Sequence, residues 1–416
     1  MKTFFNRHLR DLKKVGKSLG PGVITGASDD DPSGIMTYLL AGARHGLSLL
    51  WIAFITIPLM VAVQEMCARI GIVTKRGLVG NMKRLFPSWL LYLIALLVVV
   101  ANTFNITANF AGMIGSLQLF IPLPSFVLGV VMLFCILIGL LFFSYKNLAS
   151  IFRWLTLPLL AYIGAALLSG VDLLSMISHT LIPTNIFDRT TLLTICAVLG
   201  TTISPYLFFW QASEEVEETK LNHSKTNTTK ELKFMHKDVL TGMILSNLVM
   251  YFIIAAGSSA FHQSGSDITS LAQAASALTP VAGPLATILF CLGLIGTGML
   301  AIPVLAGSAA YVVSEAFGWP EGLGKKFHQA PQFYLIITMT LVAGLGLSLL
   351  NFDPIQMLFA TALVYGFLSP ILIFLILIIA NNKKLMGTQT NSHISNLINI
   401  VALVLMALAG VGALIL

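Results

Sequence analysis

The sequence predicts an all-α integral membrane protein with eleven transmembrane helices, and its composition is the first observation that leads to this prediction. Of the 416 residues, 56% are hydrophobic and only 10% are charged, and the mean hydropathy is +0.89. Soluble domains carry roughly 25% charged residues, because their surface must face water. A helix that spans a bilayer needs about 20 apolar residues, so the hydrophobic content is sufficient for about eleven spans. This composition excludes a secreted enzyme, a nucleic-acid-binding protein and a disordered scaffold.

The second observation is a regular series of apolar stretches separated by short polar segments. These stretches predict spans at 19–44, 47–73, 88–118, 123–144, 151–170, 190–219, 238–261, 280–317, 333–351, 354–381 and 395–416. Some of them exceed the bilayer thickness, and we expect those helices to tilt or to extend into the interface.

The third observation is the distribution of positive charge between the spans. With a cytoplasmic N-terminus, all 24 Lys and Arg residues except Arg44 and Arg189 fall on the cytoplasmic side. Because positively charged loops are retained in the cytoplasm, we predict a multi-pass protein of the cytoplasmic membrane, with its N-terminus inside and its C-terminus outside. The net charge of +7 then faces the lipid bilayer and not a nucleic acid.

Residues 1–18 form a polar and basic segment before the first span. The apolar stretch that follows this segment meets an acidic residue at Asp29, which is not the pattern of a cleavable signal peptide. We therefore expect a cytoplasmic, amphipathic N-terminus that lies on the membrane surface.

The first span, GPGVITGAS-DDDPSG-IMTYLLAGARHG, is interrupted by polar residues. Pro32 lacks an N–H group and disfavours helix at Asp31. An ionisable residue at membrane depth costs several kcal/mol and usually faces a cavity with a function. We therefore interpret Asp31 as a cation ligand, and place Asp30 along the pathway because three adjacent aspartates cannot all point into one small site. The alternatives are that some of these aspartates cap the following half-helix or lie at the interface.

The sixth span, AVLGTTISPYLFFWQASEEVEE, carries a second interruption at Pro205. Two broken helices at matching positions in two halves indicate an inverted-repeat transporter. On this basis 19–170 and 190–381 are two five-helix repeats, and 395–416 is an additional eleventh helix. Glu214 and Glu218 lie on one face at the end of the sixth span, where they either line an inner exit or form a solvated helix end.

These segments resemble the Nramp family of divalent-metal transporters over nearly the whole chain. The resemblance is carried by GPGVITGASDDDPSG followed by AGARHGLSLLW, by ARIGIVTKRGL and AGMIGSLQLFIPL, and by the glycine-led segment that ends at Pro205. It implies a LeuT-like fold with inverted repeats and broken helices 1 and 6. It also implies a metal site between the two breaks, with Asp31 as the charged ligand.

Further site residues follow from the resemblance. The family's carbonyl ligands fall on Ser28 and Thr201, and a glutamine of helix 10 falls on Thr361. The family's asparagine after the aspartate is Gly34 here, and its Met-Pro-His sequence in helix 6 begins instead with Ser204.

Tyr206 completes that altered triplet. The family's proton-linked acids of helix 3 fall on Asn109 and Gly112. Departures at these positions resemble the Nramp-related magnesium transporters.

Without a thioether, the site offers only oxygen ligands, which suit hard cations such as Mg²⁺. We expect inward transport of divalent cations, Mg²⁺ or a broad range that includes Mn²⁺, by alternating access and without proton coupling. The alternatives are a LeuT-fold symporter of a small amine-bearing substrate and a ligand sensor that does not transport. The sequence indicates no enzyme, no cofactor and no obligate protein partner, because it has no nucleophile–base set, nucleotide loop or metal-hydrolase motif.

Overall fold

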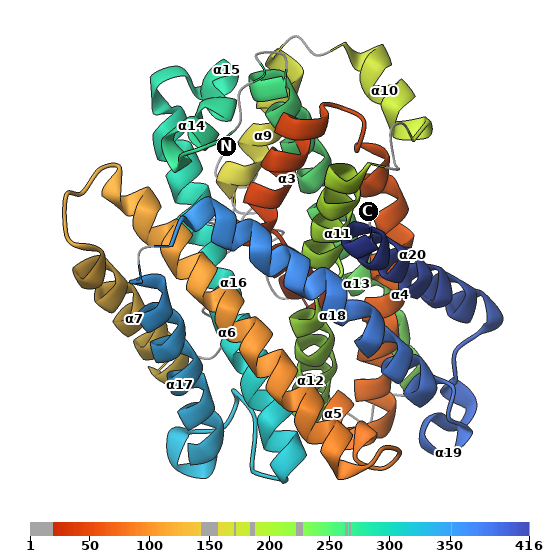
Figure 1. The fold of residues 1–416 in the computed structure, drawn as a ribbon. Coiled ribbons are helices and arrows are strands. Elements are labelled where there is room, and N and C mark those ends of the chain that lie inside the picture. Colours follow the sequence, from red (N-terminus) through yellow and green to blue (C-terminus); the bar gives the residue numbers. More distant parts are fainter. Residues whose placement is uncertain are drawn as a thin grey trace, which may run out of the picture.

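The computed structural model describes residues 20–142, 157–169, 172–183, 188–221, 228–262, 265, 268–350 and 352–415. The amphipathic segment predicted for residues 1–18 lies outside the described residues, as does the first part of the predicted span 151–170. The described chain is nearly all helical, and the helices pack side by side into one bundle (Figure 1).

The helices of the first half, in chain order, are α2 (Pro21–Asp29), α3 (Pro32–His45), α4 (Trp51–Thr74), α5 (Leu78–Met82), α6 (Ser88–Gln118), α7 (Ser125–Phe142), η1 (Leu157–Leu160), α9 (Ala161–Leu168) and α10 (Leu173–Leu181). The second half begins with α11 (Arg189–Thr202), α12 (Pro205–Leu221), α13 (Thr228–Gly257), η2 (Ser258–His262), α14 (Leu271–Ala275), η3 (Ser276–Leu278), α15 (Thr279–Ala282), η4 (Gly283–Leu285) and α16 (Ala286–Phe317). It ends with η5 (Phe327–Gln329), α17 (Pro331–Ser348), α18 (Pro354–Ala380), α19 (Lys383–Met386), η6 (Gly387–Gln389) and α20 (His393–Ile415).

Within these described residues, 8 helices are long and apolar enough to cross a membrane, or up to 9 if the bent pair Leu157–Leu168 and Leu173–Leu181 crosses as one. The first predicted span is not among them, because its interruption leaves two pieces of 9 and 14 residues. The count of eleven spans therefore stays a prediction. α13 begins ten residues before the predicted 238, because its polar first turns are helical although they are too hydrophilic for a membrane.

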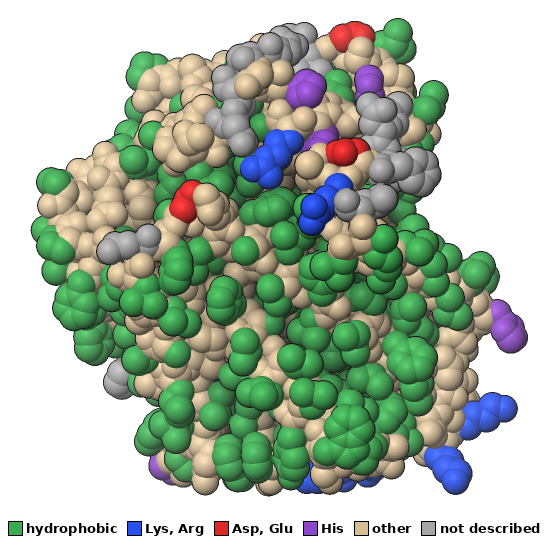
Figure 2. Space-filling view, in the orientation of Figure 1, with side chains coloured by type: hydrophobic (Ala, Val, Ile, Leu, Met, Phe, Trp, Pro, Cys, Tyr) green, Lys and Arg blue, Asp and Glu red, His purple; other side chains and the backbone are tan. Residues whose placement is uncertain are grey.

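The surface of the bundle is what a lipid environment requires. A broad hydrophobic band covers the visible face, and charged side chains gather toward its two ends (Figure 2). Large apolar side chains such as Phe54, Leu96 and Phe134 are 56%, 59% and 58% exposed. So many exposed apolar side chains would be unfavourable in water, and the chain is a multi-pass membrane protein.

Glycines allow the short helices near the bundle centre to touch their neighbours. A Cβ atom on Gly26 of α2 would lie 2.4 Å from the carbonyl oxygen of Gly242 in α13, and one on Gly22 would lie 2.6 Å from the nitrogen of Val239. On the other side of the centre, a Cβ atom on Gly200 of α11 would lie 2.1 Å from the Ala362 carbonyl oxygen in α18. Small residues let membrane helices approach closely, and here they fix α2 and α11 against long helices.

Candidate metal site

Within the first and sixth predicted spans the helix is interrupted once each, and each interruption is followed by a proline. Asp30 and Asp31 separate α2 from α3, and Ile203 and Ser204 separate α11 from α12. Proline is favoured in the first turn of a helix, because that turn does not use its N–H groups. The residue before it prefers an extended backbone, and Asp31 has φ −71° and ψ 171°.

Asp31 is the centre of the first interruption. Asp31 is 1% exposed. Its Oδ1 accepts a 2.8 Å hydrogen bond from the Gly34 nitrogen, so the Asp31 side chain caps the N-terminus of α3. Its Oδ2 accepts bonds of 3.0 Å from Nδ2 of Asn105 and 3.1 Å from Nδ2 of Asn109 in α6. These partners are neutral amides, so they orient the carboxylate without balancing its charge. A buried carboxylate in this position favours a cation beside it.

Two unpartnered oxygen atoms lie on the same amides. Oδ1 of Asn105 and Oδ1 of Asn109 are buried and have no hydrogen-bond partner within the described part of the chain. Buried polar atoms without a partner are uncommon in folded proteins. Rotation of either amide about its last torsion would turn an oxygen toward Asp31, and amide oxygens are ligands that hard cations accept. The residues present therefore fit a cation held by oxygen atoms.

The main-chain carbonyls of Ser28 and Thr201 both accept hydrogen bonds from residues at the second interruption, and the bond to Ser28 joins the two interruptions. The Tyr206 hydroxyl donates a 2.9 Å hydrogen bond to the carbonyl oxygen of Ser28. The Ser204 hydroxyl donates to the carbonyl oxygen of Thr201. Each of the two carbonyls predicted as ligands thus accepts a hydrogen bond from α12 or the residue before it, and a carbonyl oxygen has a second lone pair for another partner.

Gly34 lies between the two interruptions. A Cβ atom there would lie 3.2 Å from the Asp29 carbonyl oxygen, 3.3 Å from Oγ1 of Thr201 and 3.4 Å from the ring of Tyr38. A larger side chain at this position would crowd all three neighbours. The glycine therefore allows the two interruptions to approach each other closely.

Two other predicted pathway residues, Thr361 and Asp30, form hydrogen bonds on different helices, α18 and α13. The Thr361 hydroxyl is 3.1 Å from that of Ser33, and both donate to the Leu358 carbonyl oxygen of α18. Oδ1 of Asp30 accepts a 3.3 Å bond from Ser246 of α13, which also bonds Oδ2 of Asp29 at 2.8 Å. The structure therefore separates Asp31 from the two preceding aspartates, whose carboxylates turn to α13.

The predicted pathway residues Glu214 and Glu218 lie in the later turns of α12. Glu214 is 8% exposed and accepts a 3.3 Å hydrogen bond from the Tyr311 hydroxyl of α16. Glu218 is half-buried. Glu215, which was not among the predicted site residues, accepts a 2.9 Å bond from Gln211.

Sequence reasoning missed Asn105 and Ser246 as partners of the three aspartates. The four-residue spacing of Asn105 and Asn109 places both amides on one helix face, so this signal was present in the sequence. Ser246 is 215 residues from Asp31 and has no local signal. Among the described residues there is no group of three or more His, Cys, Asp or Glu side chains that could hold a metal, so a cation would depend on one carboxylate, amides, carbonyls and water.

Comparison with known proteins gives consistent matches. Residues 22–416 match the family described as natural resistance-associated macrophage protein-like, or Nramp. The divalent metal cation transporter MntH of Yersinia pestis (strain Pestoides F) is 28% identical over 415 residues, which cover 97% of this chain and 96% of that protein. MntH of Burkholderia ambifaria is 24% identical over 372 residues, which cover 89% and 82%.

Solved structures show the same fold. The crystal structure of the Eremococcus coleocola manganese transporter, in complex with an aromatic bis-isothiourea substituted compound, is similar with a TM-score of 0.73 and 17% identity, and the match covers 96% of this chain and 86% of that one. Mhp1, a nucleobase-cation-symport-1 family transporter, in a closed conformation with bromovinylhydantoin bound, is similar with a TM-score of 0.56 and 14% identity over 95% and 92%. At these identities the likeness shows the fold alone, which is LeuT-like.

Proposed function

The chain belongs to the Nramp family, and from this premise we propose that it carries divalent metal cations into the cell by alternating access. The observation that carries the proposal is the Asp31 carboxylate, which is buried, held by two neutral amides and placed at a helix interruption. The names of the relatives support the substrate class, since those proteins are divalent metal cation transporters.

In this proposal, α2 with α3 and α11 with α12 are the broken helices 1 and 6 of two inverted repeats, 19–170 and 190–381. The cation binds between the interruptions, through Asp31, the carbonyls of Ser28 and Thr201, and the hydroxyl of Ser204. Discontinuous helices of this kind supply main-chain carbonyls as cation ligands near the middle of a membrane.

We infer that the transported ion is Mg²⁺ or any of a broad range of divalent cations that includes Mn²⁺. The oxygen ligands give no preference for soft metals, and Mg²⁺ keeps several of its waters when it binds through one or two carboxylates.

We also propose that this transport is not coupled to protons. Asn109, which bonds Asp31 directly, cannot exchange a proton in the way that an acid at this position could. The membrane potential alone favours influx by about 2.3 kcal/mol per charge per 100 mV. The N-terminus lies in the cytoplasm and the C-terminus outside, as the positive charges predict.

The proposal is tested by uptake into proteoliposomes that contain the purified full-length protein. Mg²⁺, Mn²⁺ and Ca²⁺ are supplied outside in separate experiments, with an inward-negative potential imposed, and uptake is compared with protein-free liposomes. Uptake of Mg²⁺ that saturates with concentration supports the proposal. If none of the three ions enters faster than in protein-free liposomes, divalent transport is refuted.

A further inference from the structure

The N-terminus of α2 receives its helix cap from another helix. The nitrogen of Gly20 donates a 3.0 Å hydrogen bond to Oδ1 of Asp238 in α13, and the nitrogen of Gly22 donates a 2.6 Å bond to Oδ2. The first N–H groups of a helix are usually capped by the residue just before it, but here the capping residue comes 216 positions after Gly22. One carboxylate therefore fastens the first turn of α2 to α13.

The sequence Gly20-Pro21-Gly22 is suited to this contact. Pro21 has no N–H group to leave unsatisfied, and a Cβ atom on Gly20 would lie 2.5 Å from Oδ2 of Asp238. Asp238 is 6% exposed, and hydrogen bonds from N–H groups to a carboxylate are stronger than those between neutral groups. The glycines thus let a buried charge approach the helix end closely.

α2 is also held along its length and at its other end. The Thr25 hydroxyl lies within hydrogen-bond distance of Oε1 of Gln211 in α12, and the Ser28 carbonyl oxygen accepts the bond from Tyr206. Thr25 and Ser28 are both 0% exposed, and Asp31 is 1% exposed. With α2 in this place the candidate metal site is closed to water. In the proposed topology α2 lies between that site and the cytoplasm, so an ion released inward has to pass it.

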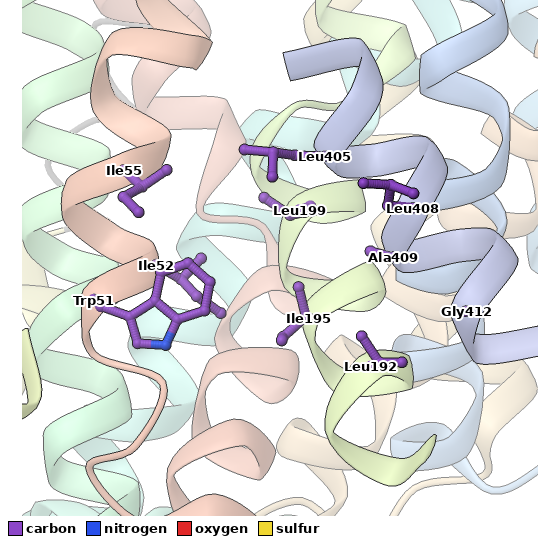
Figure 3. A pocket seen from close by; sticks show the side chains of 10 residues that line it. All are labelled: Trp51, Ile52, Ile55, Leu192, Ile195, Leu199, Leu405, Leu408, Ala409 and Gly412. Carbon is purple, nitrogen blue, oxygen red and sulfur yellow. The ribbon is translucent and has the colours of Figure 1, made fainter. Parts of the chain in front are cut away.

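α11 is the counterpart of α2 in the second proposed repeat, and it is capped differently. Its cap is Asp188, the residue directly before it, which accepts bonds from two N–H groups of the same helix. α11 also borders an apolar cavity of about 400 Å³, whose lining includes Leu199 of α11, Trp51 of α4 and Ala409 of α20 (Figure 3). The cap of α11 belongs to its own segment, whereas the cap of α2, Asp238, joins α2 to α13.

We propose that Asp238 is a positioning residue for transport, which anchors α2 while the site is closed to the cytoplasm and releases Gly20 and Gly22 when the site opens inward. The direction of opening rests on the proposed function, whereas the anchoring contact does not. Asp238→Asn should favour release, because the NH₂ group of an amide cannot accept a hydrogen bond. One of the two N–H groups then loses its partner, and the other bonds a neutral oxygen.

The test measures how fast a water-soluble thiol reagent reaches α2. Thr25→Cys introduces a thiol at the buried position that faces Gln211, and a charged methanethiosulfonate is added to the full-length protein in mild detergent without metal. Labelling of each cysteine is read by peptide mass spectrometry. Adding Asp238→Asn should speed labelling at position 25 about tenfold. Asp238→Ser, which is smaller and also neutral, should give the same increase and serves if Asp238→Asn does not fold.

Two controls distinguish a released α2 from a loosened fold. Asp353→Asn removes the charge of a cap that bonds its own helix, through the Ile355 nitrogen at 2.9 Å, so labelling at position 25 should not change. Cys67 of α4 is 0% exposed and should be labelled equally slowly in every variant. Unchanged labelling at position 25 in both Asp238 variants, or a parallel increase at Cys67, would overturn the anchoring role.

Uptake separates this inference from the proposed function. With Mg²⁺ outside the proteoliposomes, Asp238→Asn should raise the KM severalfold, because a smaller fraction of the protein is in the form that accepts an external ion. Faster labelling with an unchanged KM would refute a part for the anchor in transport. Faster labelling with no uptake of any divalent cation by the wild type would refute the proposed function and leave the anchor standing.

Discussion

Nδ2 of Asn109 lies 3.1 Å from Oδ2 of Asp31 and donates a hydrogen bond to it. The residue that the family resemblance aligns with a proton-linked acid therefore contacts the candidate metal ligand directly, as a neutral amide. This relationship has consequences for charge, coupling and selectivity, and each can be measured.

The first prediction concerns the charge of Asp31. Asp31→Asn should abolish divalent uptake in proteoliposomes, because an amide cannot balance a divalent cation. The variant should still fold, since an Asn oxygen can cap Gly34 and the amides of Asn105 and Asn109 can rotate to accept from its NH₂ group. Asp188→Asn, at the helix cap before α11, is the control and should retain uptake. Wild-type uptake by folded Asp31→Asn protein would exclude Asp31 as the charged ligand.

The second prediction concerns proton coupling. Metal influx through the wild type should not acidify the vesicle lumen, because Asn109 has no proton to exchange. Asn109→Asp should make uptake dependent on pH, since two carboxylates about 3 Å apart cannot both remain ionised. A pH dye trapped in the lumen measures both results. Acidification by the wild type in proportion to metal uptake would disprove the uncoupled mechanism.

The third prediction concerns selectivity. Gly34→Asn combined with Ser204→Met restores the family's amide and thioether, and should shift binding toward Mn²⁺ and Cd²⁺ relative to Mg²⁺ by about tenfold, or about 1.4 kcal/mol. The new Asn side chain has contacts of 3.2–3.4 Å at its Cβ, so its neighbours must move by a few tenths of an ångström. Ser204→Met alone should have a smaller effect, because it restores only one of the two ligand side chains.

Competitive calorimetry with Mg²⁺, Mn²⁺ and Cd²⁺ on the wild type and both variants gives the comparison. A wild type that already binds Cd²⁺ far more tightly than Mg²⁺ would contradict the assignment of oxygen ligands, and would require a sulfur ligand nearby.

The fourth prediction concerns stability and pH, and it uses a residue between α16 and α17. Burial, with a further contribution from the Glu315 carboxylate and against the opposing charge of Lys220, raises the pKa of Glu321 to about 9. Because an unfolded Glu titrates near pH 4.3, this site stabilises the fold most at acidic pH, and that contribution is lost as pH rises toward 9.

Glu321→Gln should therefore be increasingly more stable than the wild type from pH 5 to pH 9, as measured by thermal unfolding in detergent. Lys384→Gln changes an exposed charge and should show no such trend. A constant difference between Glu321→Gln and the wild type over this range would mean that Glu321 is ionised throughout.

Some of these features follow from the sequence and others do not. Pro32 and Pro205 can be recognised as interruptions from local chemistry, because proline limits its own backbone and that of its neighbour. The polar start of α13 at Thr228 could not be found by hydropathy, which detects burial in lipid and not helix formation in water. The contact of Ser246 with Asp29 and Asp30 arises from tertiary packing of segments far apart in the chain.

Thr361 is aligned with the family at a single position. The resemblance places it near the metal site, and in the structure its hydroxyl bonds Ser33, two residues after Asp31, and the Leu358 carbonyl. These contacts do not test a part in the ion pathway, which stays a prediction.

The glycine contacts between α2 and α13 restrict how α2 can move. A Cβ atom on Gly242 would lie 2.3 Å from the Gly22 carbonyl oxygen, and one on Gly22 would lie 2.6 Å from the Val239 nitrogen. Packing this close opposes sliding of α2 along α13, so we expect the two helices to separate by a hinge motion and not by a shear. We therefore expect a methyl group at Gly242 to push α2 away from α13, so this one small substitution would change the resting orientation of the helix that leads to Asp31.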